Sequence, residues 1–181
     1  KGWTNNLFKA VKMIQDNPAL WAKMVAFQIE RGCKKLDIYE HRWFDSGDLQ
    51  SLAMLRAIVL CAEITPQIKH WLPTREAKIV KDYRKKYGQE PSNLVIRVSS
   101  TMIGDKPIGG HENTSTVHKA GETVYGKECL AYRTNKDSEV IAKEVFGAMA
   151  REEKKEQDFG HCGNCRACWN PTVKNISYPL H

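Results

Sequence analysis

Residues 36–64 read LDIYEHRWFDSGDLQSLAMLRAIVLCAEI and carry a strand, a polar turn and an apolar helix in succession. The first part, Leu36 to Phe44, is rich in aromatic and β-branched side chains, which favour a strand. Asp45-Ser46-Gly47-Asp48 forms the polar turn. Leu49 to Ile64 is long enough for a helix and apolar around most of its circumference. A strand that leads into a helix in this way is the first half of a βαβ unit.

The same alternation continues along the chain. Ile68 to Leu72 is a second short strand, Glu76 to Tyr87 is a charged helix closed by Gly88, and Asn93 to Val98 is a third strand. Strand, helix, strand, helix and strand in this order predict a parallel sheet with right-handed crossovers. We therefore expect an α/β fold: a small parallel sheet or partial (β/α) barrel with outer helices and a cysteine-rich C-terminal lobe.

The N-terminal segment predicts two helices that cover this core. Apolar residues recur at helical spacing over residues 4–30. Asn17-Pro18 divides the segment, with Asn17 as the expected N-cap and Pro18 at the first helical position. We expect one α/β domain over residues 1–181, made of a helical cover (1–35), a βαβαβ core (36–101) and a C-terminal lobe of loop, helix and cysteine cluster (102–181).

The C-terminal lobe has a weaker pattern. A long loop rich in glycine, threonine and histidine holds a short predicted strand around Ser115 to His118. A helix is predicted from Ser138 to Lys155, between Cys129 and the later cysteines. Helix ends that are fixed by packing would bring these distant cysteines together.

Composition limits the classes of function. The chain has 181 residues, a net charge of +7 and six cysteines, with neither a membrane span nor a signal peptide visible in the sequence. Cysteines without an export signal favour a reducing compartment, so we expect a cytoplasmic protein without a membrane partner. The positive charge, concentrated in Lys78–Lys86 and Arg151–Lys155, predicts an acidic partner such as nucleic acid.

Four cysteines are the candidate metal ligands. Two residues separate Cys162 from Cys165 and Cys165 from Cys168, and Cys129 lies upstream. Thiolates are soft ligands that suit iron–sulfur clusters and zinc, and the C-x2-C-x2-C run is closer to cluster spacing than to a zinc finger with two separated pairs. We expect one [4Fe–4S] cluster on these four residues, with structural zinc as the alternative. Cys33 and Cys61 lie in helical segments and are expected to be buried thiols.

The predicted carboxyl ends of the strands carry small, polar and charged residues. Ligands of parallel α/β sheets bind at that edge. Asp45 and Arg75 are the candidate catalytic residues, as the charged poles of a small-molecule pocket. The other candidate ligand-binding residues are Ser46, Asp48, Thr74 and Ser99. The structural alternative is a set of capping turns, in which Asp48 caps the following helix.

Common catalytic motifs are absent from the sequence. It contains neither a G-x-x-x-x-G-K-[ST] phosphate loop nor G-x-G-x-x-G, and it has no nucleophile elbow. An enzymatic role would therefore rest on the cluster, as in an iron–sulfur oxidoreductase that acts on a small molecule or exchanges electrons with a donor. A nucleic-acid-binding module with a structural metal is the alternative function.

Several segments resemble the gene product 88 family of phage proteins. They are residues 39–49, 71–75, 93–99, 129–132 and 162–169, which read YEHRWFDSGDL, WLPTR, NLVIRVS, CLAY and CGNCRACW. The resemblance implies a phage or mobile-element protein that acts in the host cytoplasm. The strand-end arrangement is also loosely similar to radical-SAM-type barrels, which implies a reduced relative of such enzymes. Radical chemistry would need a C-x3-C-x2-C motif, which would have to lie upstream of Lys1.

Overall fold

The computed structural model describes residues 2–129, 131 and 165–180, and for residues 2–8 it describes the backbone alone. The chain divides into two compact units, Lys1–Val98 and Ser99–His181. Their boundary falls beside the predicted boundary between the βαβαβ core and the C-terminal lobe. The predicted helix at 138–155, the basic run at 151–155 and Cys162 lie outside the described residues.

The first unit opens with two helices, α1 (Gly2–Asp16) and α2 (Pro18–Leu36). The Asn17 side chain accepts a hydrogen bond from the Leu20 backbone N–H at 3.0 Å, which confirms Asn17 as the N-cap of α2. Asp37 follows in the left-handed conformation, and the Ile38 N–H bonds back to the Cys33 carbonyl at 3.1 Å. This C-cap occupies residues predicted to be strand, so the first strand begins later than expected.

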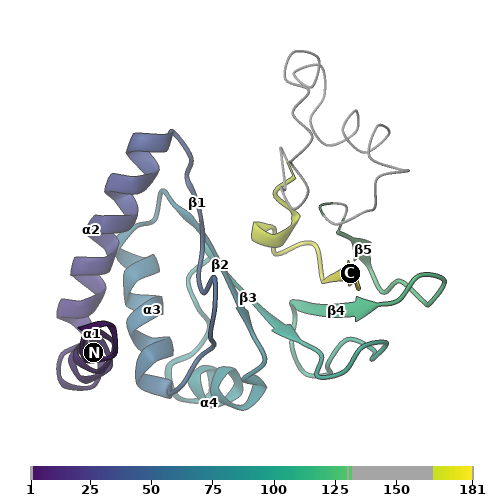
Figure 1. Ribbon diagram of the computed structural model, residues 1–181, viewed down its shortest axis with the longest axis horizontal. Coiled ribbons are helices and arrows are strands. Elements are labelled where there is room, and N and C mark those ends of the chain that lie inside the picture. The colour runs from purple at the N-terminus through teal and green to yellow at the C-terminus, as the bar shows by residue number, and fades with distance from the viewer. Residues whose placement is uncertain (1, 130, 132–164, 181) are drawn as a thin grey trace. The chain divides into compact units, whose positions relative to one another are not determined.

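The core of the first unit alternates strands and helices as predicted. In chain order it comprises β1 (Glu40–Arg42), α3 (Leu52–Ile64), β2 (Lys69–Thr74), α4 (Ala77–Tyr87) and β3 (Leu94–Ser99) (Figure 1). The three strands pair in the order β1-β2-β3, and both pairs are parallel, with His41 opposite His70 and Leu72 opposite Ile96. The α/β class with parallel strands is therefore confirmed.

The start of α3 corrects one expectation. The prediction that Asp48 caps this helix is wrong, because α3 begins at Leu52 and its N-cap is Ser51, whose Oγ accepts from the Met54 N–H at 3.1 Å. Apolar periodicity predicts a start of this helix at Leu49, because Leu49 is apolar, and the structure does bury its side chain. A buried leucine outside a helix has the same sequence signal as one within it, so capping chemistry decided the boundary.

The apolar core of this unit centres on α3. Leu55 and Ile58 on α3 have no exposed surface, and small residues of α2, Ala22 and Ala26, are buried beside the helix. Figure 1 shows α2 and α3 running next to each other. Small side chains allow two helices to approach closely, and each large apolar side chain buried between them stabilises the fold by about 1.5–3 kcal/mol.

A histidine is buried in the same unit. His70 on β2 has no exposed surface, its Nε2 lies 2.8 Å from Thr65 Oγ1, and Trp43 stacks on its ring at a centroid distance of 5.8 Å. Burial, with the neighbouring His41 as a smaller cause, lowers the pKa of His70 to about 4. The side chain is therefore neutral at physiological pH.

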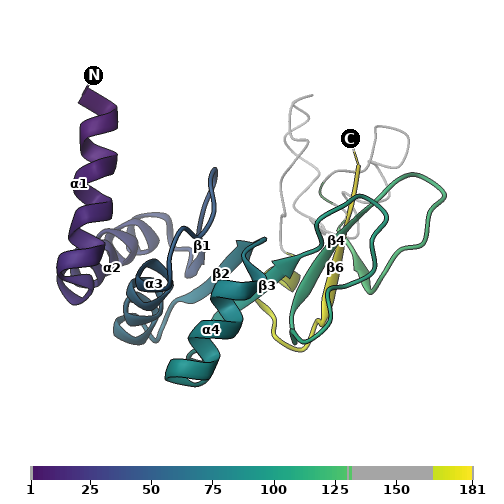
Figure 2. The same cartoon turned by 90° about the horizontal axis from the view of Figure 1, so that it is seen from below.

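The second unit contains a small parallel sheet. Its strands are β4 (Thr114–His118), β5 (Lys127–Glu128) and β6 (Asn175–Pro179), paired in the order β4-β6-β5, with a 3₁₀ turn, η3 (Ala167–Trp169), before β6. Figure 2 shows β4 alongside β6. The prediction of a strand at Ser115–His118 is confirmed, while β5 and β6 were not predicted. Among the described residues, no helix has the length and apolar character needed to cross a bilayer.

Candidate metal centre

Cys129, the first predicted ligand, directly follows β5. Glu128 on β5 lies opposite Ser177 on β6, and the Cys129 N–H donates to the Ser177 carbonyl at 2.8 Å. Continuing this register by one residue sets Cys129 opposite Tyr178. Residues opposite each other on neighbouring parallel strands have their side chains on the same sheet face. The hydrogen bond therefore fixes the backbone of Cys129 beside Tyr178.

The close approach of β5 to β6 depends on Gly126. Its φ is +71°, and a Cβ at this position would lie 2.6 Å from the Asn175 carbonyl oxygen and 3.0 Å from the Asn175 Cβ. Real Cβ atoms do not approach a backbone oxygen this closely. Only glycine allows the chain to pass Asn175 here and carry Cys129 to its place.

Cys168, the last predicted ligand, belongs to η3. It is 6% exposed, and its Sγ lies 3.4 Å from the Tyr178 hydroxyl oxygen. Tyr178 therefore lies beside Cys168 through its side chain and beside Cys129 through its backbone. Two of the four predicted ligands, far apart in the sequence, thus lie next to the same residue of the central strand.

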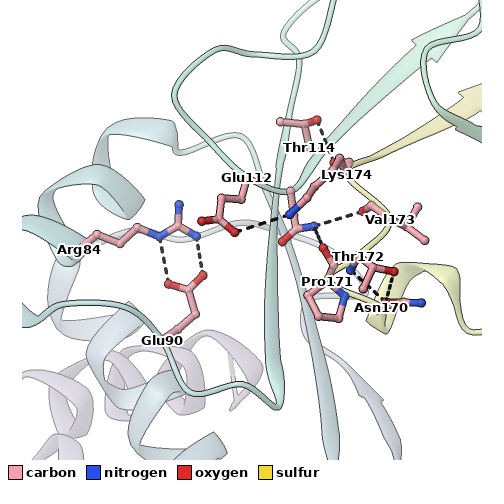
Figure 3. Close-up of polar contacts among 10 residues, drawn as sticks. Arg84, Glu90, Glu112, Thr114, Asn170, Pro171, Thr172, Val173 and Lys174 are labelled. Carbon is pink, nitrogen blue, oxygen red and sulfur yellow. Dashed lines mark hydrogen bonds and ion pairs between the residues drawn. The ribbon is translucent and has the colours of Figure 1, made fainter.

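The segment between η3 and β6 is fixed to β4. The Asn113 side chain donates to the carbonyls of Pro171 at 2.9 Å and Val173 at 3.1 Å, and the Thr114 N–H donates to the Lys174 carbonyl at 2.8 Å. Figure 3 shows residues 170–174 and the contact of Lys174 with Glu112 at 3.8 Å. These bonds give the turn that follows Cys168 a defined place against the sheet.

The remaining two predicted ligands precede η3. Cys165 is half-buried and its carbonyl accepts from Arg166 Nη1 at 3.1 Å, whereas Cys162 lies outside the described residues. Within residues 2–129, 131 and 165–180, no three His, Cys, Asp or Glu side chains are arranged to hold a metal ion. The complete four-cysteine site stays a prediction. Among its four members, Cys129 and Cys168 both lie next to Tyr178.

The other two cysteines are buried in the first unit, as predicted. Cys33 is 8% exposed and Cys61 is fully buried. Burial raises the pKa of the Cys61 thiol to about 12, and burial also raises the pKa of Cys33, with Glu40 as a smaller cause. Because metals bind the thiolate, these protonated thiols are poor ligands at neutral pH.

At the strand ends, the structure brings together three of the predicted pocket residues. The Asp48 carboxylate accepts from the Thr74 hydroxyl at 2.5 Å and from the Arg75 backbone N–H at 2.8 Å, as well as from the Leu49 N–H at 2.7 Å. Asp48 thus connects the loop after β1 to the end of β2. With both oxygens used in this way, Asp48 and Thr74 hold the two loops together.

The other predicted pocket residues have different surroundings. Asp45, Ser46 and the Arg75 side chain are exposed. Ser99 is the last residue of β3, and its hydroxyl lies 2.8 Å from that of Ser115. Because both side chains are exposed, Asp45 and Arg75 are accessible to a ligand. A ligand site with these two residues as its charged poles stays a prediction.

Sequence reasoning missed a polar network on β4, β6 and β5, in which His118 and Ser177 are buried. His118 Nδ1 lies 2.7 Å from Ser177 Oγ, and His118 Nε2 lies 3.5 Å from Glu128 Oε1. Thr116 Oγ1 also bonds to Ser177 at 3.1 Å. The order serine, histidine and carboxylate resembles a catalytic triad, but Ser177 has no exposed surface, so a substrate carbonyl has no access to its hydroxyl. The alternation of polar and apolar residues over 175–178 was the sequence signal for this strand.

A family model described as Gene product 88 matches residues 5–171. No curated protein and no solved structure matches the chain.

Proposed function

We propose that this chain, which belongs to the Gene product 88 family, is an iron–sulfur protein that holds one [4Fe–4S] cluster through Cys129, Cys162, Cys165 and Cys168. The observation that carries the proposal is the position of Cys129 and Cys168, which both lie next to Tyr178 although they are distant in the sequence. Such convergence of soft ligands is what a four-thiolate site needs. When bound, the cluster would supply one-electron redox chemistry.

The ligand count favours one kind of role. Four cysteines for one cluster give every iron a thiolate, which suits electron transfer or structural support better than substrate activation at an open iron. Cys168 is almost fully buried, which shields that side of the site from water and shifts a redox potential. We infer an electron-transfer or structural protein of the host cytoplasm, with zinc on the same four cysteines as the alternative metal.

The test is anaerobic purification followed by iron, sulfide and zinc analysis. The expected product is brown, with broad visible absorbance and about four irons and four sulfides per chain. Cys165→Ser should abolish the colour, while Cys33→Ala, which removes a buried cysteine of the other unit, should leave it unchanged. One equivalent of zinc without iron would show that the four cysteines form a zinc site and not a cluster site. A metal-free product would refute both the cluster and the zinc site.

A second candidate function is nucleic-acid binding, which the surface of α4 favours. Lys81, Lys85 and Lys86 are exposed on this helix. The predicted basic face is smaller than expected, because Arg84 forms an ion pair with Glu90 (Figure 3) and Lys78 contacts Asp82 at 2.5 Å. Basic residues in the last turn also stabilise the helix dipole, so the charge has a structural explanation as well.

Salt dependence tests this candidate. Binding to a DNA or RNA duplex should weaken steeply with salt, by a slope of about 0.9 for each phosphate that a lysine neutralises. Replacing Lys81, Lys85 and Lys86 with alanine should reduce the slope. Replacing Lys9, Lys23 and Lys34, exposed lysines of α1 and α2, removes the same charge and should leave the slope unchanged. Equal effects of the two triple variants would show that only net charge matters.

A further inference from the structure

Tyr178 occupies a position from which it can influence the cysteine site. It lies on β6, the central strand of the second unit, opposite Val117 of β4. On its other side the β5 register continues to Cys129, which bonds to the neighbouring Ser177 carbonyl at 2.8 Å. A residue of a central strand is held by hydrogen bonds on both edges, so Tyr178 cannot shift without breaking two ladders.

The phenol of Tyr178 meets the sulfur of Cys168. The hydroxyl oxygen lies 3.4 Å from Sγ, a normal separation for an O–H···S contact because sulfur is larger than oxygen. A protonated thiol is a weak donor and acceptor, whereas a thiolate only accepts. When Cys168 binds a metal as a thiolate, the hydroxyl must therefore be the donor.

We propose that Tyr178 is the positioning residue of the cysteine site: its hydroxyl donates a hydrogen bond to the Cys168 sulfur, orients it and lowers the electron density that this sulfur gives to a bound metal. The inference rests on the proposed four-cysteine site and adds a residue that is not itself a ligand. Cys168 is 6% exposed, so little water can replace the hydroxyl as donor. Partners of this kind are worth about 10–100-fold in metal affinity.

Cobalt is the probe, because Co²⁺ occupies thiolate sites of either zinc or cluster type and gives sulfur-to-metal charge-transfer bands. The metal-free full chain is titrated with Co²⁺ under reducing, anaerobic conditions, as wild type and as Tyr178→Phe. Phenylalanine keeps the ring and removes only the hydroxyl. The dissociation constant should rise by about 10-fold or more. The charge-transfer band should move to longer wavelength, because sulfur electrons without a hydrogen bond lie higher in energy.

Tyr125→Phe is the matched control, since Tyr125 is a half-buried tyrosine of the same unit. It should change neither the affinity nor the band. Site-specific fluorotyrosine at position 178 strengthens the hydroxyl as a donor and should move the band to shorter wavelength, which tests the proposal even if Tyr178→Phe folds poorly.

The outcomes separate the two proposals. Wild-type chain that binds no Co²⁺ overturns the four-cysteine site and the role of Tyr178 with it. Wild-type chain that binds Co²⁺ with the same affinity and the same band as Tyr178→Phe overturns the role of Tyr178 alone. A charge-transfer band that does not move with fluorotyrosine at position 178 also overturns the role of Tyr178 alone.

Discussion

Gly126→Ala should destabilise the second unit and, with it, the proposed cysteine site. The side chain of alanine costs about 1 kcal/mol for the left-handed φ of +71° alone. Its Cβ would also lie 2.6 Å from the Asn175 carbonyl oxygen, so the chain before β5 must move away from β6. Two hydrogen bonds lie in the path of that movement, from Asn175 Nδ2 to the Tyr125 carbonyl and from the Cys129 N–H to the Ser177 carbonyl. At about 1 kcal/mol each, their loss brings the total to about 3 kcal/mol.

Gly121→Ala is the control that isolates the contact from the strain. Gly121 has a φ of +80°, but nothing lies within 4 Å of the position of an added Cβ. Alanine there should cost only the backbone term of about 1 kcal/mol. The two variants therefore differ by about 2 kcal/mol if the close approach of Gly126 to Asn175 is real.

Urea unfolding of the two metal-free variants, followed by circular dichroism, measures this difference in the free energy of unfolding. Metal analysis after anaerobic purification adds a second readout: Gly126→Ala should retain less metal because Cys129 is displaced, and Gly121→Ala should retain the wild-type amount. Equal destabilisation by the two substitutions would refute the claim that the approach of β5 to β6 requires a glycine at position 126.

Three further predictions concern the first unit. Because the folded-state pKa of His70 is lowered from 6.5 to about 4, the unfolded chain binds the proton first as pH falls. The free energy of unfolding should therefore be largest above pH 6.5 and decrease by about 3 kcal/mol between pH 6.5 and 4. Urea unfolding at several pH values should show this decrease, and His70→Leu should reduce it. An equally large decrease in His70→Leu would contradict the role of His70. Ser51→Ala removes the N-cap of α3 and should cost about 1 kcal/mol in the same assay, with Ser46→Ala, an exposed loop serine, as the neutral control. Asp48→Ala removes the acceptor for Thr74, Arg75 and Leu49 and should cost about 2 kcal/mol; a loss as small as that of exposed Asp45→Ala would show that the two loops do not depend on it.

The amino-acid sequence by itself determined the fold class and the order of elements in the first unit. Its strands and helices have strong local signals: apolar periodicity, the Asn17-Pro18 boundary and Gly88, whose φ of +86° ends α4 as expected. Local signals act over a few residues, so they fix which segment becomes helix or strand. The same chemistry singled out the four cysteines, because ligand softness is a property of the residue type.

Only the tertiary structure decided which segments pair as strands and which distant side chains come into contact. Residues Lys127–Glu128 and Asn175–Pro179 have weak strand signals alone. They become strands by pairing with each other, and Asn175–Pro179 also pairs with β4 on its other edge. Asp48 has the sequence context of a helix cap, yet its carboxylate accepts hydrogen bonds at the end of β2, because the fold brings the Thr74 hydroxyl and the Arg75 N–H, 26 and 27 residues away, within reach. Tyr178 stands next to Cys168 for the same reason: a contact that spans the turn between η3 and β6 depends on packing and hydrogen bonding across the sheet, which no local pattern encodes.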